Sequence, residues 1–174
     1  DRLRRMTDPF PRVQPSELAA LDVGTFGRAY ADFMHTHQLK WIRLSAEVES
    51  VLIPEDRLAI RYLLLHDAFH VLLGFDVSPA GELGVWTFVG AQRYSRSFER
   101  AATVAGVFYA ITHPLTVGPL RRARHRGLAL AARARCLIAE PMEQWWEEPL
   151  EPLRSRLGIE GPPGPDRPLH LRRN

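Results

Sequence analysis

The feature that most constrains this chain is the segment 58–86, where apolar residues recur at helical spacing around two histidines. A helix turns by about 100° per residue, so His66 and His70 fall on one face, with Asp67 beside them. The same face continues through apolar residues at Ala59, Leu63 and Leu73. This spacing predicts a helix whose two imidazoles point into an otherwise apolar interior, where buried polar groups need partners.

Start and stop signals define this helix and the one that follows it. The first helix opens at residues 54–56, where a proline is followed by two acids, and Gly74 predicts its end. Ser78 is the expected N-cap of the next helix, and Pro79 is its first residue. Glu82 then falls in the first turns of this second helix, one short loop after the histidines. We therefore expect its carboxylate to fold back toward them.

His66, Asp67, His70 and Glu82 together indicate a divalent metal site. Two histidines four residues apart on a helix, next to a carboxylate, resemble helical zinc motifs in which both imidazoles bind the ion. Each residue also has an ordinary explanation: a core histidine is usually hydrogen-bonded, an adjacent aspartate can orient its ring, and a glutamate favours a helix N-terminus. Burying all four without a cation is costly, which favours the metal. We expect zinc, with iron, manganese or magnesium as alternatives.

The spacing from His66-Asp67 to His70 and then to Glu82 resembles the metal motif of the coenzyme Q biosynthesis protein 4 family. Residues 27–34 are similar to the family's early helix, and residues 146–159 are similar to its ending. The resemblance implies a role in ubiquinone biosynthesis. It implies removal of the ring C1 carboxylate from a polyprenylated 4-hydroxybenzoate-type acid, with hydroxylation at that carbon.

Three glycines, Gly84, Gly90 and Gly106, occur within predicted helices. Each costs up to about 1 kcal/mol relative to alanine inside a helix, so their use indicates either close helix packing or room for a bound group. By the resemblance, an apolar channel for an isoprenoid tail could be lined by Trp86, Val89, Val104, Val107 and Phe108. The sequence leaves a channel and a packed core as alternatives.

Length and composition fit a single globular domain. The chain has 174 residues, of which 45% are apolar and 25% are charged. No strand-like alternation of useful length appears, which predicts an all-α, single-domain bundle of about six to eight helices with an apolar interior or channel. We expect residues 1–15 to form an extended arm, residues 16–160 to form the helical metal- and lipid-binding domain, and residues 161–174 to form a disordered, proline-rich tail.

Cys136 is the only cysteine, which excludes an internal disulfide and agrees with a reducing compartment. Any metal must therefore bind to histidine and carboxylate side chains. The longest apolar-leaning run, residues 101–111, is well short of the roughly 20 residues that a spanning helix needs. No signal-like segment opens the sequence. We expect a cytoplasmic location, with peripheral contact to the inner face of the membrane as the alternative.

A basic helix is predicted from Pro119 to about Ala139. Its arginines are Arg121, Arg122, Arg124, Arg126, Arg133 and Arg135, and its apolar side carries Leu130, Ala134, Leu137 and Ile138. The arginine face is either solvated or contacts anionic lipid head groups. Nucleic acid is not expected, because basic and aromatic residues do not interleave and no reader motif occurs. The Trp145-Trp146 pair indicates either a packing role or a homodimer interface. We expect the protein to form a homodimer.

Three functions are consistent with these residues. The first is a metal-dependent oxidative decarboxylase in which the four candidate ligands act on the prenylated acid. The second is a non-catalytic scaffold that binds a prenyl lipid and organises other quinone-biosynthesis proteins. The third is an HD-type phosphohydrolase, because His66-Asp67 resembles that doublet, with His35 or His37 and Asp76 as further candidates. The phosphohydrolase function gives no role to His70 and Glu82.

Overall fold

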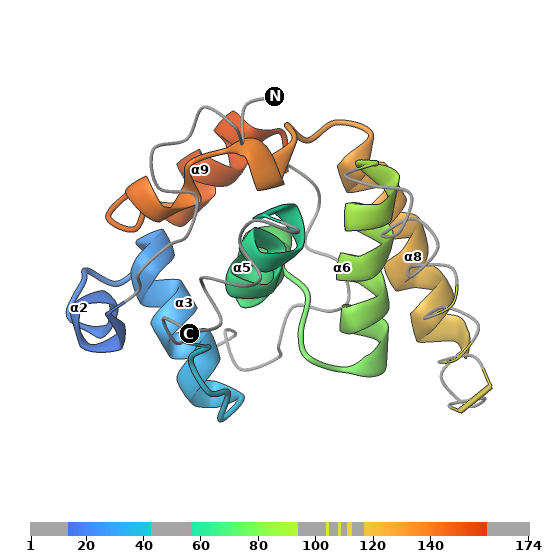
Figure 1. Cartoon of the computed structure of the whole chain (residues 1–174), viewed down its shortest axis with the longest axis horizontal. Helices are drawn as coiled ribbons and strands as arrows, with labels where there is room; N and C mark the ends of the chain where they lie inside the picture. The colour runs from blue at the N-terminus through green and yellow to red at the C-terminus, as the bar shows by residue number, and fades with distance from the viewer. Residues whose placement is uncertain are drawn as a thin grey trace, which may run out of the picture. The chain divides into compact units, whose positions relative to one another are not determined.

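The computed structural model describes residues 14–42, 57–93, 104, 108, 111–112 and 117–159 (Figure 1). The α-helices among them are α2 (Pro15–Ala19), α3 (Phe26–Thr36), α5 (Arg57–Leu73), α6 (Pro79–Ala91), α8 (Val117–Ala131) and α9 (Leu150–Leu157), with 3-10 turns η2 (Leu137–Ala139) and η3 (Met142–Gln144). Within this part of the chain the β-type pairing is one isolated bridge, between Thr25 and Pro149. The predicted all-α fold is confirmed.

The chain divides into two compact units, residues 1–71 with 136–153 and residues 72–135 with 154–174. Several predicted features fall largely or wholly outside the described residues: the arm at 1–15, the helix opening at 54–56, Gly106 and the tail at 161–174. The domain bounds stay a prediction. No helix among the described residues is long and apolar enough to cross a membrane.

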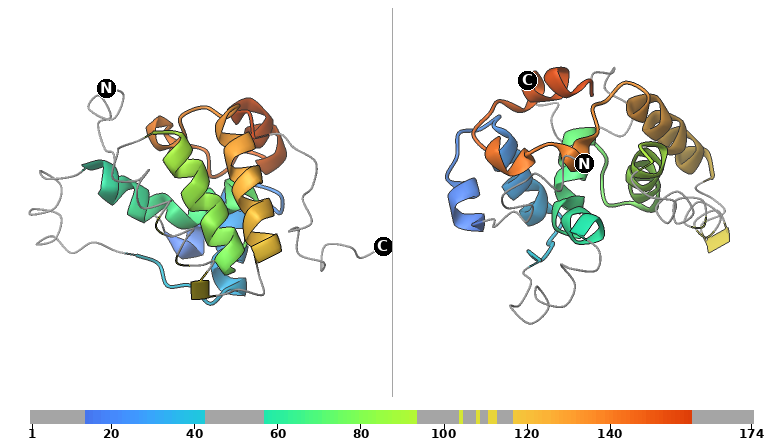
Figure 2. Two further views of the ribbon diagram at one scale, coloured as in Figure 1. Left: turned by 90° about the vertical axis from the view of Figure 1, so that its right-hand side faces the viewer. Right: turned by 45° about the horizontal axis from the view of Figure 1, so that its top comes forward.

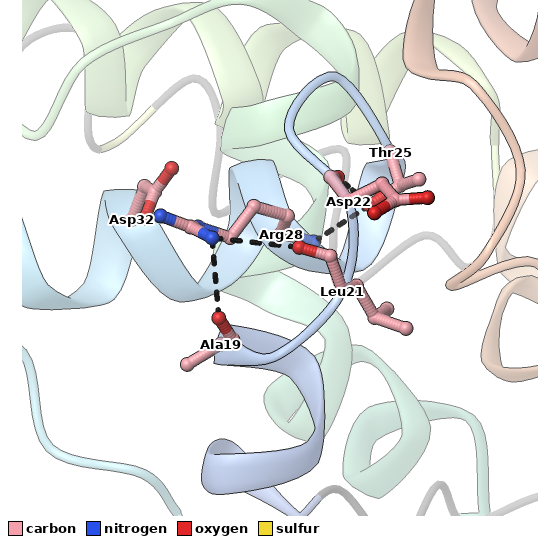
Figure 3. A network of polar contacts seen from close by, with 6 residues as sticks. All are labelled: Ala19, Leu21, Asp22, Thr25, Arg28 and Asp32. Atoms are coloured by element: carbon pink, nitrogen blue, oxygen red, sulfur yellow. Dashed lines mark hydrogen bonds and ion pairs between the residues drawn. The ribbon is translucent and has the colours of Figure 1, made fainter.

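In the first unit, helix α3 begins at a capping residue that also joins it to the preceding loop (Figure 3). The hydroxyl of Thr25 accepts a hydrogen bond from the Arg28 backbone N–H at 3.3 Å and donates one to the Asp22 carbonyl at 2.7 Å. The Arg28 guanidinium pairs with Asp32 one turn further on, at 2.9 Å, and donates to the carbonyls of Ala19, at the end of α2, and Leu21 at 3.2 and 3.4 Å. The cap and the arginine therefore fix how the chain enters α3.

Aromatic packing holds α3 against the segment before α9. Trp146 stacks on Phe26 and on Tyr30, with ring centroids 4.7 and 5.4 Å apart. The first two amides of α3 donate to the carbonyls of Glu148 and Trp146 at 2.8 and 2.7 Å, which satisfies N–H groups that lack intrahelical partners. A β-carbon at Gly27 would lie 3.0 Å from the Trp146 β-carbon, so the glycine permits this approach. Trp146 thus has a packing role within its own unit.

Helix α5 is held in the first unit by a fully buried arginine. Arg61 is 0% exposed. Its guanidinium donates to the carbonyls of Ile138 and Glu140 at 2.9 and 2.7 Å and pairs with the Glu143 carboxylate at 2.8 Å. These acceptors belong to the two 3-10 turns and the residues next to them, where the backbone has no regular ladder. One cation therefore satisfies several polar groups that burial would otherwise make costly.

In the second unit, α6 and α8 lie side by side (Figure 2). The buried face of α8 carries Leu120, Ala123, Gly127 and Leu130. A β-carbon at Gly127 would lie 2.6 Å from the Gly84 carbonyl oxygen, so a glycine is needed for the helices to approach this closely. A β-carbon at Gly84 would in turn overlap the ring of Phe75. Close packing therefore accounts for Gly84.

The predicted basic helix ends earlier than expected, at Ala131 rather than near Ala139. The side chain of Gln92 donates to the carbonyls of Ala134 and Arg135 at 3.4 and 2.7 Å. The Arg135 N–H donates to the Leu157 carbonyl at 2.9 Å. These long-range hydrogen bonds replace the helical ladder, although the local sequence has good helix propensity.

Two arginines cap the end of α5. Gly74 follows the helix with φ +68°, as its predicted role as the terminating residue requires. Arg126 donates to the carbonyls of Leu73 and Gly74 at 2.6 and 2.9 Å, and Arg154 donates to that of Leu72 at 2.9 Å. Cations are favoured at this negative end of a helix. Arg126 is half-buried, so its expected place on a solvated or lipid-facing arginine surface was wrong.

We expect Arg61→Met to lower the free energy of unfolding by about 3–5 kcal/mol, because it leaves a carboxylate and two carbonyls without their buried cation. Asp32→Asn is the matched control: it removes an exposed ion pair and should change stability by no more than about 0.5 kcal/mol. Urea unfolding followed by circular dichroism measures both. An Arg61→Met protein as stable as Asp32→Asn would contradict this account of α5.

Candidate metal centre

His66 and His70 project from the same side of α5 and lie next to each other. Their ring centroids are 4.8 Å apart, with the planes inclined by 68°. A ring nitrogen of His66 and a ring nitrogen of His70 lie within 4.8 Å of each other. His70 is 1% exposed, whereas the His66 side chain is 21% exposed. The pair therefore consists of one deeply buried imidazole and one at the margin of the core.

The predicted inward stripe of α5 was wrong at Leu63, which is 46% exposed. The buried side of the helix instead includes Leu65, Ala68, Phe69 and Leu72. Helix α5 is apolar around much of its circumference, so several stripes are compatible with its sequence. The helix is turned so that His70 is central to the buried side and His66 is at its edge.

Asp67 lies beside His66. Its Oδ1 is 3.2 Å from the His66 Nδ1, and its side chain is 22% exposed. A carboxylate on one ring nitrogen fixes the tautomer and the orientation of an imidazole, and leaves the other nitrogen for a metal. The geometry thus gives Asp67 an orienting role, and direct coordination by this residue stays a prediction.

Glu82 belongs to the second unit, in the first turn of α6. Ser78 caps that helix as predicted, since its hydroxyl accepts the Gly81 N–H at 3.1 Å. The Glu82 N–H donates to the Ser78 carbonyl at 2.8 Å, and its side chain is half-buried. The predicted helix start is confirmed. That the Glu82 carboxylate binds the same ion as the two imidazoles stays a prediction.

Aromatic residues that the motif does not include surround the histidine pair. Phe33, on α3, stacks on His70 with ring centroids 5.7 Å apart and planes 25° apart. Tyr62, on α5, meets His66 edge-on at 5.5 Å. The helical spacing of apolar residues in α3 indicates a core-facing helix. Nothing in that spacing shows which of its residues contacts a histidine.

Tyr30, on α3, is a further buried residue that the motif does not include. It is 4% exposed and contacts Trp41 edge-on at 5.0 Å. Burial raises the pKa of the Tyr30 hydroxyl well above its usual range, and the negative charge of Asp67 adds to the shift. The phenol therefore stays protonated in the folded chain at neutral pH and feels the carboxylate that orients His66.

The further residues of the phosphohydrolase hypothesis have other roles. His35 is exposed near the end of α3, and His37 lies against Phe33 with ring centroids 4.6 Å apart. The Asp76 carboxylate accepts hydrogen bonds from the Ser78 N–H, at 3.0 Å, and from the Ser78 hydroxyl. Asp76 therefore stabilises the turn before α6, which weakens its case as a metal ligand.

Fold and site together describe an all-α protein with a two-histidine helix as its candidate metal centre. The family model described as Coenzyme Q (ubiquinone) biosynthesis protein Coq4 matches residues 10–163. The chain therefore belongs to this family. The match contains every residue of the candidate site and both further segments that resemble the family, 27–34 and 146–159.

Individual relatives agree with this assignment. The mitochondrial ubiquinone biosynthesis protein COQ4 homolog of Danio rerio is 30% identical over 154 residues, which cover 85% of this chain and 54% of the relative. The Bos taurus homolog is 28% identical over 172 residues, 88% of this chain and 59% of the relative. The chain thus spans little more than half the length of these curated relatives.

A solved structure is similar in fold. The crystal structure of a presumed ubiquinone biosynthesis protein from Nostoc punctiforme aligns with a TM-score of 0.71 at 24% identity. The alignment covers 92% of this chain and 79% of that chain. At this identity the likeness supports the helical fold alone.

We expect stability to fall more steeply with pH in the unsubstituted protein than in Tyr30→Phe. The unfolded chain releases the phenol proton near the ordinary tyrosine pKa of about 10, whereas burial keeps Tyr30 protonated in the folded chain. The contribution of Tyr30 is therefore complete below pH of about 10, and is lost above it by up to about 1.4 kcal/mol per pH unit. Urea unfolding across this range measures the difference, and equal slopes in the two proteins would contradict it.

Proposed function

We propose that this chain acts in ubiquinone biosynthesis and that His66, Asp67, His70 and Glu82 form a site for one divalent cation. The observation that carries the proposal is the histidine pair. Two imidazoles one helical turn apart have ring centroids 4.8 Å apart, and a carboxylate lies 3.2 Å from the Nδ1 of one of them. This is the donor arrangement of helical zinc sites, including the carboxylate that orients a ligating histidine.

The donor chemistry fits a resident metal. Two nitrogens and two carboxylates suit zinc, and they also suit iron or manganese, whereas magnesium prefers oxygen ligands. Within the first unit, Phe33 and Tyr62 flank the imidazoles with apolar ring surface. Exclusion of water in such a site strengthens the attraction between a cation and its ligands.

Chain connectivity supports Glu82 as the remaining ligand. Five residues separate the end of α5 at Leu73 from the start of α6 at Pro79. Gly74 turns the chain with a positive φ, and Arg126 holds that turn through its carbonyl. A connection of this length is typical of paired helices, which supports a carboxylate from the first turn of α6 as a ligand of the same ion.

For the reaction, we propose that dioxygen and water convert a polyprenylated 4-hydroxybenzoate-type acid to the C1-hydroxylated ring, carbon dioxide and hydrogen peroxide. The bond from C1 to the carboxylate breaks, a C1–O bond forms, and dioxygen takes up the two electrons that the substrate gives up. A bound divalent cation would supply positive charge for the substrate carboxylate. Asp67 holds the orientation of His66. Glu82, in the first turn of α6, would bind the ion and accept a proton in the site.

A second candidate function is a non-catalytic scaffold for a prenyl lipid and other quinone-biosynthesis proteins. Exposed apolar side chains in the second unit favour it: Val104, Phe108 and Ile111 are 67%, 58% and 73% exposed, at the spacing of one helical face. Helix α8 also exposes Arg121, Arg122 and Arg124. Apolar and cationic side chains of this kind suit a surface of anionic lipid.

We expect the purified protein to hold about one divalent ion per chain, and His66→Ala and His70→Ala to abolish its binding, because each removes one of two essential nitrogen donors. His35→Ala removes an exposed histidine on α3 and should leave the ion in place. Elemental analysis by mass spectrometry after gel filtration gives both the identity and the amount of metal. Full occupancy in both α5 variants would exclude this site.

Enzyme and scaffold are distinguished by turnover. We expect metal-loaded protein under air to release carbon dioxide from a prenylated 4-hydroxybenzoate and to form the hydroxylated product, followed by mass spectrometry. Glu82→Gln should lose about 100-fold or more in rate if the carboxylate acts as a ligand or base, and should still bind the prenyl lipid. Tight lipid binding without turnover in the unsubstituted protein would instead support the scaffold.

A further inference from the structure

Phe33 contacts His70 on α5, although Phe33 belongs to none of the motifs found in the sequence. From α3 it stacks on the face of the His70 ring, with centroids 5.7 Å apart and planes inclined by 25°. It also contacts His37, the residue that follows α3, with ring centroids 4.6 Å apart. All three rings belong to the first unit.

A stacked neighbour has a particular effect on a ligating histidine. A metal binds an imidazole nitrogen in the plane of the ring, so contact with the ring face leaves both nitrogens accessible at the edge. The second torsion of histidine is otherwise broad, and a parallel aromatic face restricts it. A ring that is already oriented loses less conformational freedom when it binds a ligand.

The two histidines of α5 are oriented by different means. His66 has the Asp67 carboxylate at 3.2 Å from its Nδ1 and the edge of Tyr62 at 5.5 Å. His70 is 1% exposed and has the face of Phe33. One imidazole is thus held by a charged hydrogen-bond acceptor, and the other by an aromatic plane from a different helix.

We propose that Phe33 is a positioning residue that sets the ring plane of His70 and thereby the affinity and geometry of the metal site. The inference rests on the proposed function, because it assigns α3 a role in that same site. It makes α3 part of the metal centre although none of its side chains binds the ion.

The experiment titrates the full chain with Co²⁺ alone, whose visible absorption reports both the dissociation constant and the ligand geometry. Phe33→Leu keeps the apolar volume but removes the flat face, and it should weaken Co²⁺ binding about tenfold and alter the spectrum. Phe33→Tyr retains the aromatic face and should bind as the unsubstituted chain does. Phe33→Met, which fills the space with a flexible thioether, is a second test if Phe33→Leu does not fold.

The matched control is Trp41→Leu, which removes an aromatic contact with Tyr30 in the same unit without touching a histidine. It should bind Co²⁺ with unchanged affinity and spectrum. The proposal is overturned if Phe33→Leu or Phe33→Met binds Co²⁺ like the unsubstituted chain. It is also overturned if Phe33→Tyr or Trp41→Leu is weakened as much as Phe33→Leu. Failure of the unsubstituted chain to bind Co²⁺ would overturn the metal site itself, and that result is distinct from the others.

Discussion

The proposed site is built on two imidazoles held one turn apart on a single helix. His70 is 1% exposed, and its ring centroid is 4.8 Å from that of His66. One ring nitrogen of each lies within 4.8 Å of one on the other ring, close enough for the two to share a ligand. A shared divalent cation makes the same proximity favourable, because neutral imidazoles are its preferred nitrogen ligands. We therefore propose that the pair, its aspartate and the aromatic rings around it act as one unit.

Helix α5 can hold this pair because arginines fix it through backbone carbonyls. Arg61 binds two carbonyls and a carboxylate in the first unit, and Arg126 binds the last carbonyls of α5 in the second. A planar guanidinium can donate to two carbonyls at once, whereas an ammonium group acts as a point charge. Lys40 is the only lysine in the chain. At Arg61 and Arg126, at least, the arginine has a structural use that a lysine would not match.

Local signals predicted the helical fold, the C-terminal end of α5 and the start of α6 well. Gly74 has the left-handed conformation expected of a terminating residue, and Ser78 caps α6. Features set by long-range contacts were not accessible from the sequence. The exposure of Leu63 could not be predicted, because α5 is apolar on several sides. The early end of α8 depends on hydrogen bonds from Gln92, far away in sequence. The stacking of Phe33 on His70 depends on how α3 packs against α5.

The most direct test of the four-residue centre is an anomalous difference map from crystals of the zinc-loaded protein, with data collected at the zinc absorption edge. The account predicts one strong peak at about 2.0–2.2 Å from a ring nitrogen of His66, a ring nitrogen of His70 and a carboxylate oxygen of Glu82. Asp67 should either be a further ligand of the ion or keep its contact with the His66 Nδ1. A peak elsewhere, or a Glu82 carboxylate directed away from an ion held by the histidines, would contradict the proposed centre.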